Sequence, residues 1–286
     1  HSLARSLARS RHALCSFARL CISCGGIHRN LGVHISKVRS SSLDTKVWDE
    51  AMLGLFERFE TANPGIVNRV WEARMDEVDG LADQKPTASS PIEAKEQFIS
   101  LKYVDKAFLS SKSAGKRHDQ ARVSTDLWSA IERDDIVAVY EALSIADQRL
   151  ASPPDAAAAL AESLVGVDSV ESVESGGEVP GSGGRELDTF LPTHVHLAAR
   201  HGNTDVLLLL LLSGKCGFDE ETDASGRSAL AYALWFDQPD AAKLLLKHGY
   251  RQTPDFAGWS PLAILRGRGE LSLRCASDPE LLELLI

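Results

Sequence analysis

The chain lacks the features that place a protein across a membrane or in an oxidising compartment. Its longest apolar run, Val206 to Leu212, is far shorter than the ~20 residues that a helix needs to cross a bilayer. Its five cysteines are an odd number in a chain of 286 residues, which is well above the size that needs disulfides for stability. We therefore expect a protein of a reduced compartment, located in the cytoplasm, with room for about two domains of about 150 residues.

Acidic residues are missing from residues 1–40, which carry six Arg and one Lys although the whole chain has a net charge of -9. Such a basic segment can face nucleic acid, an acidic membrane surface or a phosphorylated ligand, and charge alone does not choose between them. The chain begins at His1 rather than Met, and its Arg- and Ser-rich opening is similar to a mitochondrial transit peptide. We interpret it instead as a fragment or a mistranslated start.

Apolar residues at helical spacing predict a compact helical domain that ends near Leu109. Asp44 is expected to cap its first long helix. The core face of that helix is predicted to carry Trp48, Met52, Leu55, Phe56 and Phe59. A second helix is expected over residues 66–73, after the Asn63-Pro64-Gly65 stop. A third helix is expected to begin at Pro91.

The C-terminal part of the chain repeats itself. The segment THVHLAA, which begins at Thr193, aligns with SALAYAL from Ser228, 35 residues later, and with SPLAIL from Ser260, another 32 residues later. Ankyrin repeats have a period near 33 residues. The Thr or Ser is expected to cap the first helix of each repeat, and the leucine-rich second helix is expected to stack on the next repeat. An insertion in the third copy predicts an incomplete array.

The segment Cys21-Ile22-Ser23-Cys24 is weak evidence of a metal site by itself, because two thiolates are half of the four ligands of a structural zinc. The residues that follow, from Gly26 to Ser40, read GIHRNLGVHISKVRS. They resemble, nearly residue for residue, the signature of Arf GTPase-activating (ArfGAP) domains. The resemblance covers about residues 20–109 and includes Leu43-Asp44, the Trp48 helix, Ala62-Asn63, Val70-Trp71-Glu72, Lys85-Pro86 and the segment Phe98 to Val104. Family members with ankyrin repeats behind this domain fit the order of the chain.

The resemblance implies a protein that stimulates GTP hydrolysis by an Arf-type small GTPase and so regulates membrane traffic. In the family, the Arg that matches Arg29 is an arginine finger. Hydrolysis spreads negative charge over the transferring phosphoryl group, and a guanidinium supplied in trans offers several rigid N–H donors to that charge. Arg29 is therefore the candidate catalytic residue of a GTPase activator, rather than of an enzyme with its own substrate turnover. The alternative is that Arg29 pairs with an acidic residue on a helix.

The resemblance also implies a zinc ion, with Cys21 and Cys24 as two of its ligands and no other cofactor-binding site. Family members carry an earlier Cys-x-x-Cys, but the corresponding positions here are His1 and Ala4. Cys15 lies at the wrong spacing for the family's site, although zinc accepts substitute ligands. Because a structural zinc contributes folding energy, the missing pair puts zinc binding and the hold on Arg29 in question.

Four further polar residues surround the motif. His28 and His34 lie six residues apart, which is irregular for a helical metal pair, and we expect no ligand role for them. Lys37 and Arg39 are interpreted either as contacts to the GTPase or an acidic lipid surface, or as a solvated basic face.

The predicted fold class is mainly α, with a small zinc-finger-type helical domain and an ankyrin-repeat solenoid. The predicted parts are an atypical basic N-terminal segment (1–19), an incomplete ArfGAP-like domain (20–109), a polar linker (110–124), a divergent ankyrin repeat (125–150), an acidic, Gly- and Ser-rich disordered insert (151–190) and ankyrin repeats (191–286).

Three functions are compared. The first is activation of an Arf-type GTPase by a cytoplasmic protein, with peripheral contact to an acidic membrane. The alternative is a catalytically crippled scaffold whose ankyrin repeats bind a protein partner. A nucleic-acid-binding zinc finger is disfavoured, because no aromatic platform or finger-type His pair accompanies the basic segment.

Overall fold

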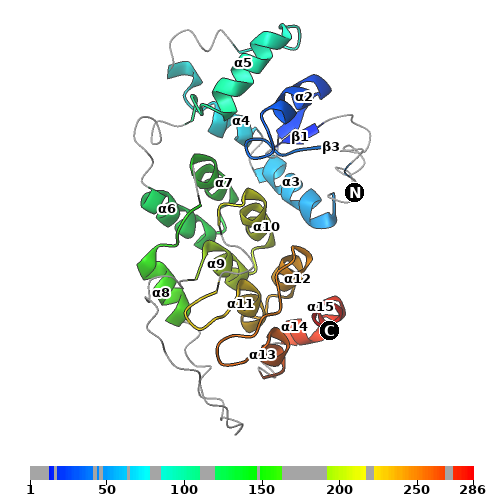
Figure 1. The fold of residues 1–286 in the computed structure, drawn as a ribbon, viewed down its shortest axis with the longest axis vertical. Coiled ribbons are helices and arrows are strands. Elements are labelled where there is room, and N and C mark those ends of the chain that lie inside the picture. The colour runs from blue at the N-terminus through cyan, green and yellow to red at the C-terminus, as the bar shows by residue number, and fades with distance from the viewer. Residues whose placement is uncertain are drawn as a thin grey trace. The chain divides into compact units, whose positions relative to one another are not determined.

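The computed structural model describes residues 13–15, 18–40, 44, 48–62, 65–77, 85–109, 120–146, 149–162, 192–216, 222–267 and 273–286. The chain divides into two compact units, His1–Asp119 and Gln120–Ile286, each of which is considered by itself. Both units are mainly helical (Figure 1). This confirms the predicted fold class.

The first unit begins with a small antiparallel sheet in the order β2-β1-β3. Strand β1 (Ala13–Cys15) lies between β2 (Ala18–Leu20) and β3 (Val38–Ser40). Helix α2 (Ile22–Asn30) follows β2 and packs against β1, β3 and α5 (Ile92–Tyr103). The segment from Gly26 to Ser40 therefore runs from a helix that is covered on one side into an edge strand.

Helix α3 (Glu50–Ala62) begins later than the sequence predicts. The carboxylate of Asp49 accepts a hydrogen bond from the backbone N–H of Met52 at 2.9 Å, which is the N-cap contact of this helix. Asp44 accepts a hydrogen bond from the backbone N–H of Ser40 at 2.6 Å instead. The prediction that Asp44 caps this helix is therefore wrong, because its short side chain is used to close the turn after β3.

Trp48 lies just before α3 and joins it to the sheet. Its indole N–H donates to the backbone carbonyl of Ser40 at 3.0 Å, and its ring meets that of Phe56 edge-on at 5.6 Å between centroids. Leu55, Phe56 and Phe59 are buried, as the helical spacing predicts. Trp48 thus acts as a core residue although it is outside the helix.

The described part of the first unit continues with α4 (Ile66–Trp71), the 3-10 helix η2 (Met75–Glu77) and α5. The ammonium group of Lys102 on α5 is buried and bonds to the side chains of Asn68 at 2.8 Å and Glu72 at 2.7 Å. Lys85 donates to the other oxygen of Glu72 at 2.6 Å. Burial opposes ionisation of Glu72, but the hydrogen bonds and charges of Lys102 and Lys85 outweigh it and lower the pKa of its carboxyl. This ion-paired cluster fastens α4 to α5.

The second unit is a stack of helix pairs. The described helices of the array are α6 (Gln120–Glu132), α7 (Ile136–Ile145), α9 (His194–His201), α10 (Thr204–Ser213), α11 (Ala229–Trp235), α12 (Pro239–Lys247), α13 (Pro261–Gly267), α14 (Leu273–Ser277) and α15 (Pro279–Leu285). The first helices pack in the row α6, α9, α11 and α13, and the second helices in the row α7, α10, α12 and α15. Such a two-row stack is the architecture of an ankyrin array (Figure 1).

The same backbone turn recurs within three successive helix pairs. Asp134, Gly202 and Asp237 each adopt a positive φ, at 53°, 71° and 55°, between the two helices of their pair. Gly202 is the C-cap residue of α9 and closes it by donating to the carbonyls of Ala198 and Ala199. The match at Asp134 places α6 and α7 in register with the repeats that follow.

Two predicted segments differ from the structure. Helix α6 begins at Gln120, inside the predicted linker 110–124. Helix α8 (Pro154–Glu162) lies inside the predicted disordered insert 151–190, with Ala157 and Leu160 buried. Its sequence starts with Pro-Asp and continues with four alanines, which favours a helix more strongly than the acidic composition opposes it. The remainder of the insert, residues 163–190, is outside the described residues.

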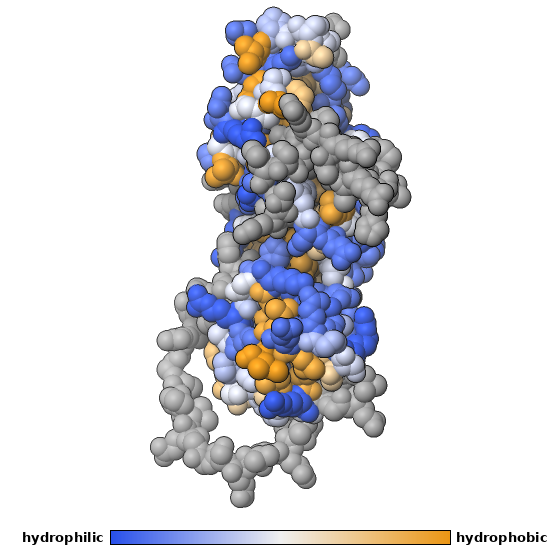
Figure 2. All heavy atoms as spheres, turned by 90° about the vertical axis from the view of Figure 1, so that its right-hand side faces the viewer, coloured by the Kyte–Doolittle hydropathy of each residue, from blue (hydrophilic) through white to orange (hydrophobic). Residues whose placement is uncertain are grey.

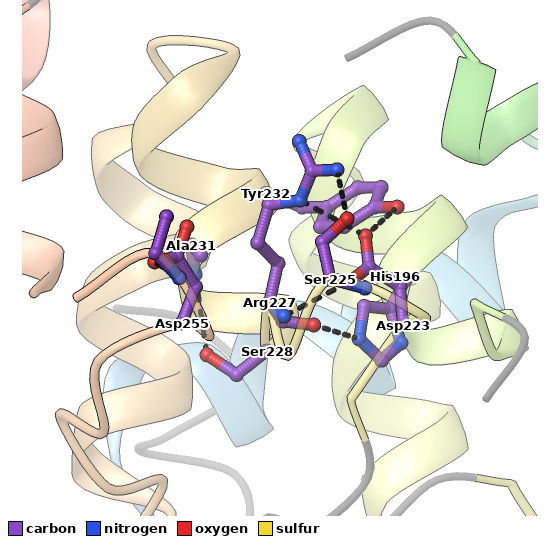
Figure 3. A network of polar contacts seen from close by, with 9 residues as sticks. His196, Asp223, Ser225, Arg227, Ser228, Ala231, Tyr232 and Asp255 are labelled. Atoms are coloured by element: carbon purple, nitrogen blue, oxygen red, sulfur yellow. Dashed lines mark hydrogen bonds and ion pairs between the residues drawn. The ribbon is translucent and has the colours of Figure 1, made fainter. Parts of the chain in front are cut away.

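A buried polar network fastens the loop before α11 to α9 (Figure 3). One oxygen of Asp223 accepts from the backbone N–H groups of Ser225 and Arg227, both at 2.9 Å. Its other oxygen accepts from the Tyr232 hydroxyl at 3.0 Å and pairs with the Arg227 guanidinium at 3.1 Å. Asp255 holds the corresponding loop of the next repeat through the backbone of Trp259 at 2.8 Å. An aspartate at the equivalent position therefore holds this loop in each of two consecutive repeats.

Candidate functional site

Arg29 lies in the last turn of α2, on the exposed side of that helix. Ile27 and His28 are buried directly before it, so the helix fixes its backbone while its side chain faces solvent. Within the described residues, no hydrogen bond or ion pair joins the Arg29 guanidinium to another side chain. The described structure therefore leaves its N–H donors available for a group outside the chain.

A buried polar pair holds the segment around Arg29. Nδ1 of His28 and the hydroxyl of Ser36 are 2.9 Å apart, and both side chains are buried. The His28 ring also meets the Tyr103 ring of α5 edge-on, with centroids 4.9 Å apart. Burial, and next the charge of Lys102, lower the pKa of His28 to about 4. His28 is therefore neutral near pH 7 and serves as an anchor beside the charged Arg29.

The turn between α2 and β3 is tightly closed. Gly32 has φ +91°, a conformation that side chains of L-residues rarely adopt, and a Cβ on it would meet the His34 ring at 2.6 Å. The carbonyl of Gly32 accepts hydrogen bonds from the N–H groups of Ile35 at 3.1 Å and Ser36 at 2.9 Å. This turn leaves Val33 with 76% of its surface exposed.

Cys21 and Cys24 lie at the start of α2. Cys21 is the N-cap residue, and its sulfur accepts from the backbone N–H of Cys24 at 3.4 Å and lies 3.2 Å from the Ser23 hydroxyl. These contacts, first the one with Ser23, lower the pKa of the Cys21 thiol to about 7, whereas burial raises that of Cys24. The two thiols are therefore adjacent, and Cys21 is exposed and the more easily ionised.

The donor set does not complete a zinc site within the described structure. No group of three or more His, Cys, Asp or Glu side chains that could hold a metal ion occurs among the described residues. His28 is committed to Ser36, and His34 packs over Gly32. Cys15 belongs to β1, but its side chain is outside the description. Two thiols alone do not fit the four-coordinate geometry of a structural zinc.

Sequence reasoning named Arg29 but missed the residues that hold it. It gave His28 no special role and did not consider Ser36. The spacing of eight residues between them follows neither a helix nor a strand period, so no local pattern could reveal the contact. Lys37 and Arg39 are exposed near the same turn, as the sequence suggests.

Comparisons with protein families match both units. Residues 9–112 match the ArfGap family of GTPase-activating proteins for Arf, and residues 175–255 match a family of three ankyrin repeats. The two matches follow one another in the order that the motif and the repeats predict.

Named relatives agree with these matches. The Arabidopsis thaliana ADP-ribosylation factor GTPase-activating protein AGD4 is 29% identical over 93% of this chain and 35% of its own length. Its relative AGD2, from the same plant, is 34% identical over 46% of this chain and 17% of its own length. The human Arf-GAP with coiled-coil, ANK repeat and PH domain-containing protein 3 is 49% identical over 32% of this chain and 10% of its own length. The chain thus spans about a third or less of the curated relatives it matches.

None of the helices in the described part of the chain has the length and apolar character needed to cross a membrane. The signature around Arg29, the stacked helix pairs and the two family matches lead to one assignment. The chain carries an ArfGap domain followed by ankyrin repeats.

Proposed function

We propose that the first unit stimulates GTP hydrolysis by an Arf-type small GTPase, with Arg29 as the arginine finger. The observation that carries this proposal is the state of Arg29: it is exposed, unpaired within the described residues, and attached to a helix that a buried polar pair anchors. An Arg that served only the fold would be expected to bond to its own chain. The ArfGap match over residues 9–112 supports the choice of GTPase.

In this mechanism the chain contributes one positively charged side chain in a fixed position. The GTPase holds GTP and the attacking water, and phosphoryl transfer develops negative charge that a guanidinium can neutralise. The His28–Ser36 pair already holds the end of α2. The conformational entropy lost on docking is therefore mainly that of the Arg29 side chain. His28 stays neutral above its pKa of about 4, so it does not compete with Arg29 for the phosphate.

Zinc enters the proposal only as a structural support. Cys21 and Cys24 would supply two thiolate ligands at the start of α2. The described residues do not complete the ligand set, so no step of the mechanism passes through a metal. The Lys37 and Arg39 side chains are exposed and positively charged, and we propose that this basic region faces an acidic membrane surface at the cytoplasmic side.

A transition-state analogue tests the proposal. An Arf-type GTPase loaded with GDP is mixed with aluminium fluoride and the purified chain, and the complex is measured by gel filtration. We expect a complex that forms with wild type and with Arg122→Lys, an exposed control on α6, but not with Arg29→Lys. Equal complex formation by Arg29→Lys would remove Arg29 from the proposed role, and no complex with any variant would remove the function.

The second candidate function is a scaffold in which the ankyrin array binds a protein partner. It is favoured by Phe256, which lies on a loop of the array with 72% of its surface exposed. Figure 2 also shows apolar side chains gathered low in the view, at the height of α12 and α15 in Figure 1, and Ile286 is 96% exposed. A pull-down with the second unit as bait, repeated with Phe256→Asp, tests this function: the partner is expected to be lost in the variant, and unchanged capture contradicts it.

A further inference from the structure

Val33 is the most exposed large apolar side chain in the described part of the first unit, at 76%. Its exposure is not a product of a loose loop. Gly32 holds the turn in a left-handed conformation, two backbone hydrogen bonds close on its carbonyl, and Ser36 at the far end is buried on His28. The fold thus presents an apolar side chain to water on a rigid support.

We propose that Val33 is an apolar contact for the GTPase that Arg29 serves. The proposal rests on the proposed function, since it takes the occupant of this surface from the role of Arg29. A surface valine on a preorganised turn binds a partner with little loss of conformational freedom. Burying it also removes apolar area from water, which is the type of contact found in the core of protein interfaces.

The position of Val33 relative to Arg29 supports this occupant. The two residues are four apart in the sequence, and even a fully extended chain of four residues spans only ~14 Å. A standard protein interface covers about 800 Å² on each partner, which corresponds to a disc of about 16 Å radius. The chain in between is shorter than an extended chain, because Gly32 N–H bonds back to the Arg29 carbonyl at 3.2 Å. An interface centred on Arg29 therefore reaches the turn that carries Val33.

Charge substitution at this position has a specific expected effect. Val33→Asp places a carboxylate where apolar contact is expected, and burial without a partner disfavours the complex. We expect KM for the GTPase to rise about tenfold or more, with kcat at saturation within about twofold of wild type. Val33→Thr keeps the shape and replaces one methyl group with a hydroxyl, so we expect a smaller rise of a few-fold. Because the side chain makes little contact with its own unit, both variants are expected to fold.

The experiment uses the full chain and an Arf-type GTPase without its lipid anchor, in a solution free of lipid. Single-turnover hydrolysis gives KM and kcat, and binding of the GTPase loaded with a non-hydrolysable GTP analogue gives Kd. Ile92→Asp is the matched control, because Ile92 is also an exposed apolar residue of the first unit, at 52%, but lies at the start of α5 rather than on the turn after α2. Far-UV circular dichroism confirms the fold of each variant.

The outcomes separate the two proposals. A rise in KM and Kd for Val33→Asp but not for Ile92→Asp supports the inference. Unchanged KM and Kd for Val33→Asp, while Arg29→Lys loses kcat, overturn the role of Val33 and leave the proposed function standing. An effect that appears only when acidic vesicles are added shows a membrane contact and also overturns it. A wild-type chain that neither binds nor activates the GTPase refutes the proposed function, and the role of Val33 with it.

Discussion

Two buried histidines of helix α9 make the ankyrin unit sensitive to acid. Nδ1 of His196 accepts from the backbone N–H of Thr193 at 3.0 Å, so its proton must lie on Nε2, which donates to the carbonyl of Arg227 at 3.2 Å. Nε2 of His194 lies 3.1 Å from the carbonyl of Ser124, while its Nδ1 is buried with no hydrogen-bond partner among the described residues. A second proton on His196 would lie on Nδ1 and face the N–H donor of Thr193. A second proton on His194 would lie on Nδ1 and find no acceptor among the described residues.

The pKa values follow from this geometry. Burial lowers the pKa of His194 to about 4, and the hydrogen bond to the Ser124 carbonyl only partly opposes it. Burial also lowers the pKa of His196 to about 4, against the charge of Asp223 and the carbonyl of Arg227. In the unfolded chain both return to an ordinary value near 6.5. The unfolded state therefore binds more protons below pH 6.5, and stability that is present above this pH is lost as the pH falls toward 4.

The expected loss in the free energy of unfolding is large for a domain. Within this window, each histidine lowers the free energy of unfolding by about 1.4 kcal/mol for every pH unit. From pH 7 to pH 5 the two together remove about 4 kcal/mol, which corresponds to a fall of about 10 °C in Tm for a unit of this size.

The assay is urea unfolding at pH 7 and pH 5, followed by circular dichroism, for wild type and for the double variant His194→Gln, His196→Gln. We expect the double variant to be less stable at pH 7 but to lose much less stability between the two pH values. His248→Gln, at an exposed position after α12, is expected to keep the wild-type dependence. His28 contributes equally to all three proteins, so it cancels in the comparison. The same loss of stability in wild type and double variant would show that His194 and His196 do not cause the acid sensitivity.

Three further predictions concern single side chains. Ser36→Ala leaves Nδ1 of His28 buried without its partner, so we expect the first unit to lose about 1–3 kcal/mol in urea unfolding while exposed Ser23→Ala changes little; an unchanged midpoint for Ser36→Ala would contradict the anchor. Asp223→Asn breaks a buried ion pair and is expected to cost about 3 kcal/mol or more in the same assay, whereas Asp240→Asn, whose carboxylate is exposed, is expected to cost less than about 1 kcal/mol; equal costs would argue against the loop network. A maleimide is expected to label Cys21 before Cys216 and Cys275, because burial raises the pKa of those two thiols to about 12, and added zinc is expected to slow the labelling of Cys21 if Cys21 and Cys24 are ligands; labelling of the buried thiols before Cys21 would contradict the structure.

Local signals predicted much of the fold. The capping residues Thr193 and Ser228 start their helices as expected, because the contact of an N-cap side chain involves only the next three residues. The stacking order of the repeats follows from their period. Arg29 was chosen as the candidate catalytic residue through a long sequence motif, and this role stays a prediction.

Contacts between distant segments could not be predicted. Lys102 and Glu72 are 30 residues apart and His28 and Ser36 are eight apart, and nothing in the pattern of either segment names its partner. The cap of α3 was assigned to Asp44 rather than Asp49, because both are acidic residues before an apolar stripe and only the closed turn after β3 distinguishes them. Asp134 and Asp237 adopt the left-handed conformation that glycine usually provides. Without a glycine at Asp134, the sequence does not show how the first helix pair aligns with the later repeats.

The arginine-finger role of Arg29 is tested most directly by the single-turnover rate of GTP hydrolysis by an Arf-type GTPase with saturating wild-type chain, compared with Arg29→Lys. We predict strong acceleration by wild type and a loss of about a thousandfold or more in Arg29→Lys, while binding of the GTP-loaded GTPase persists. Acceleration that is the same with Arg29→Lys, or none with wild type, would contradict this role.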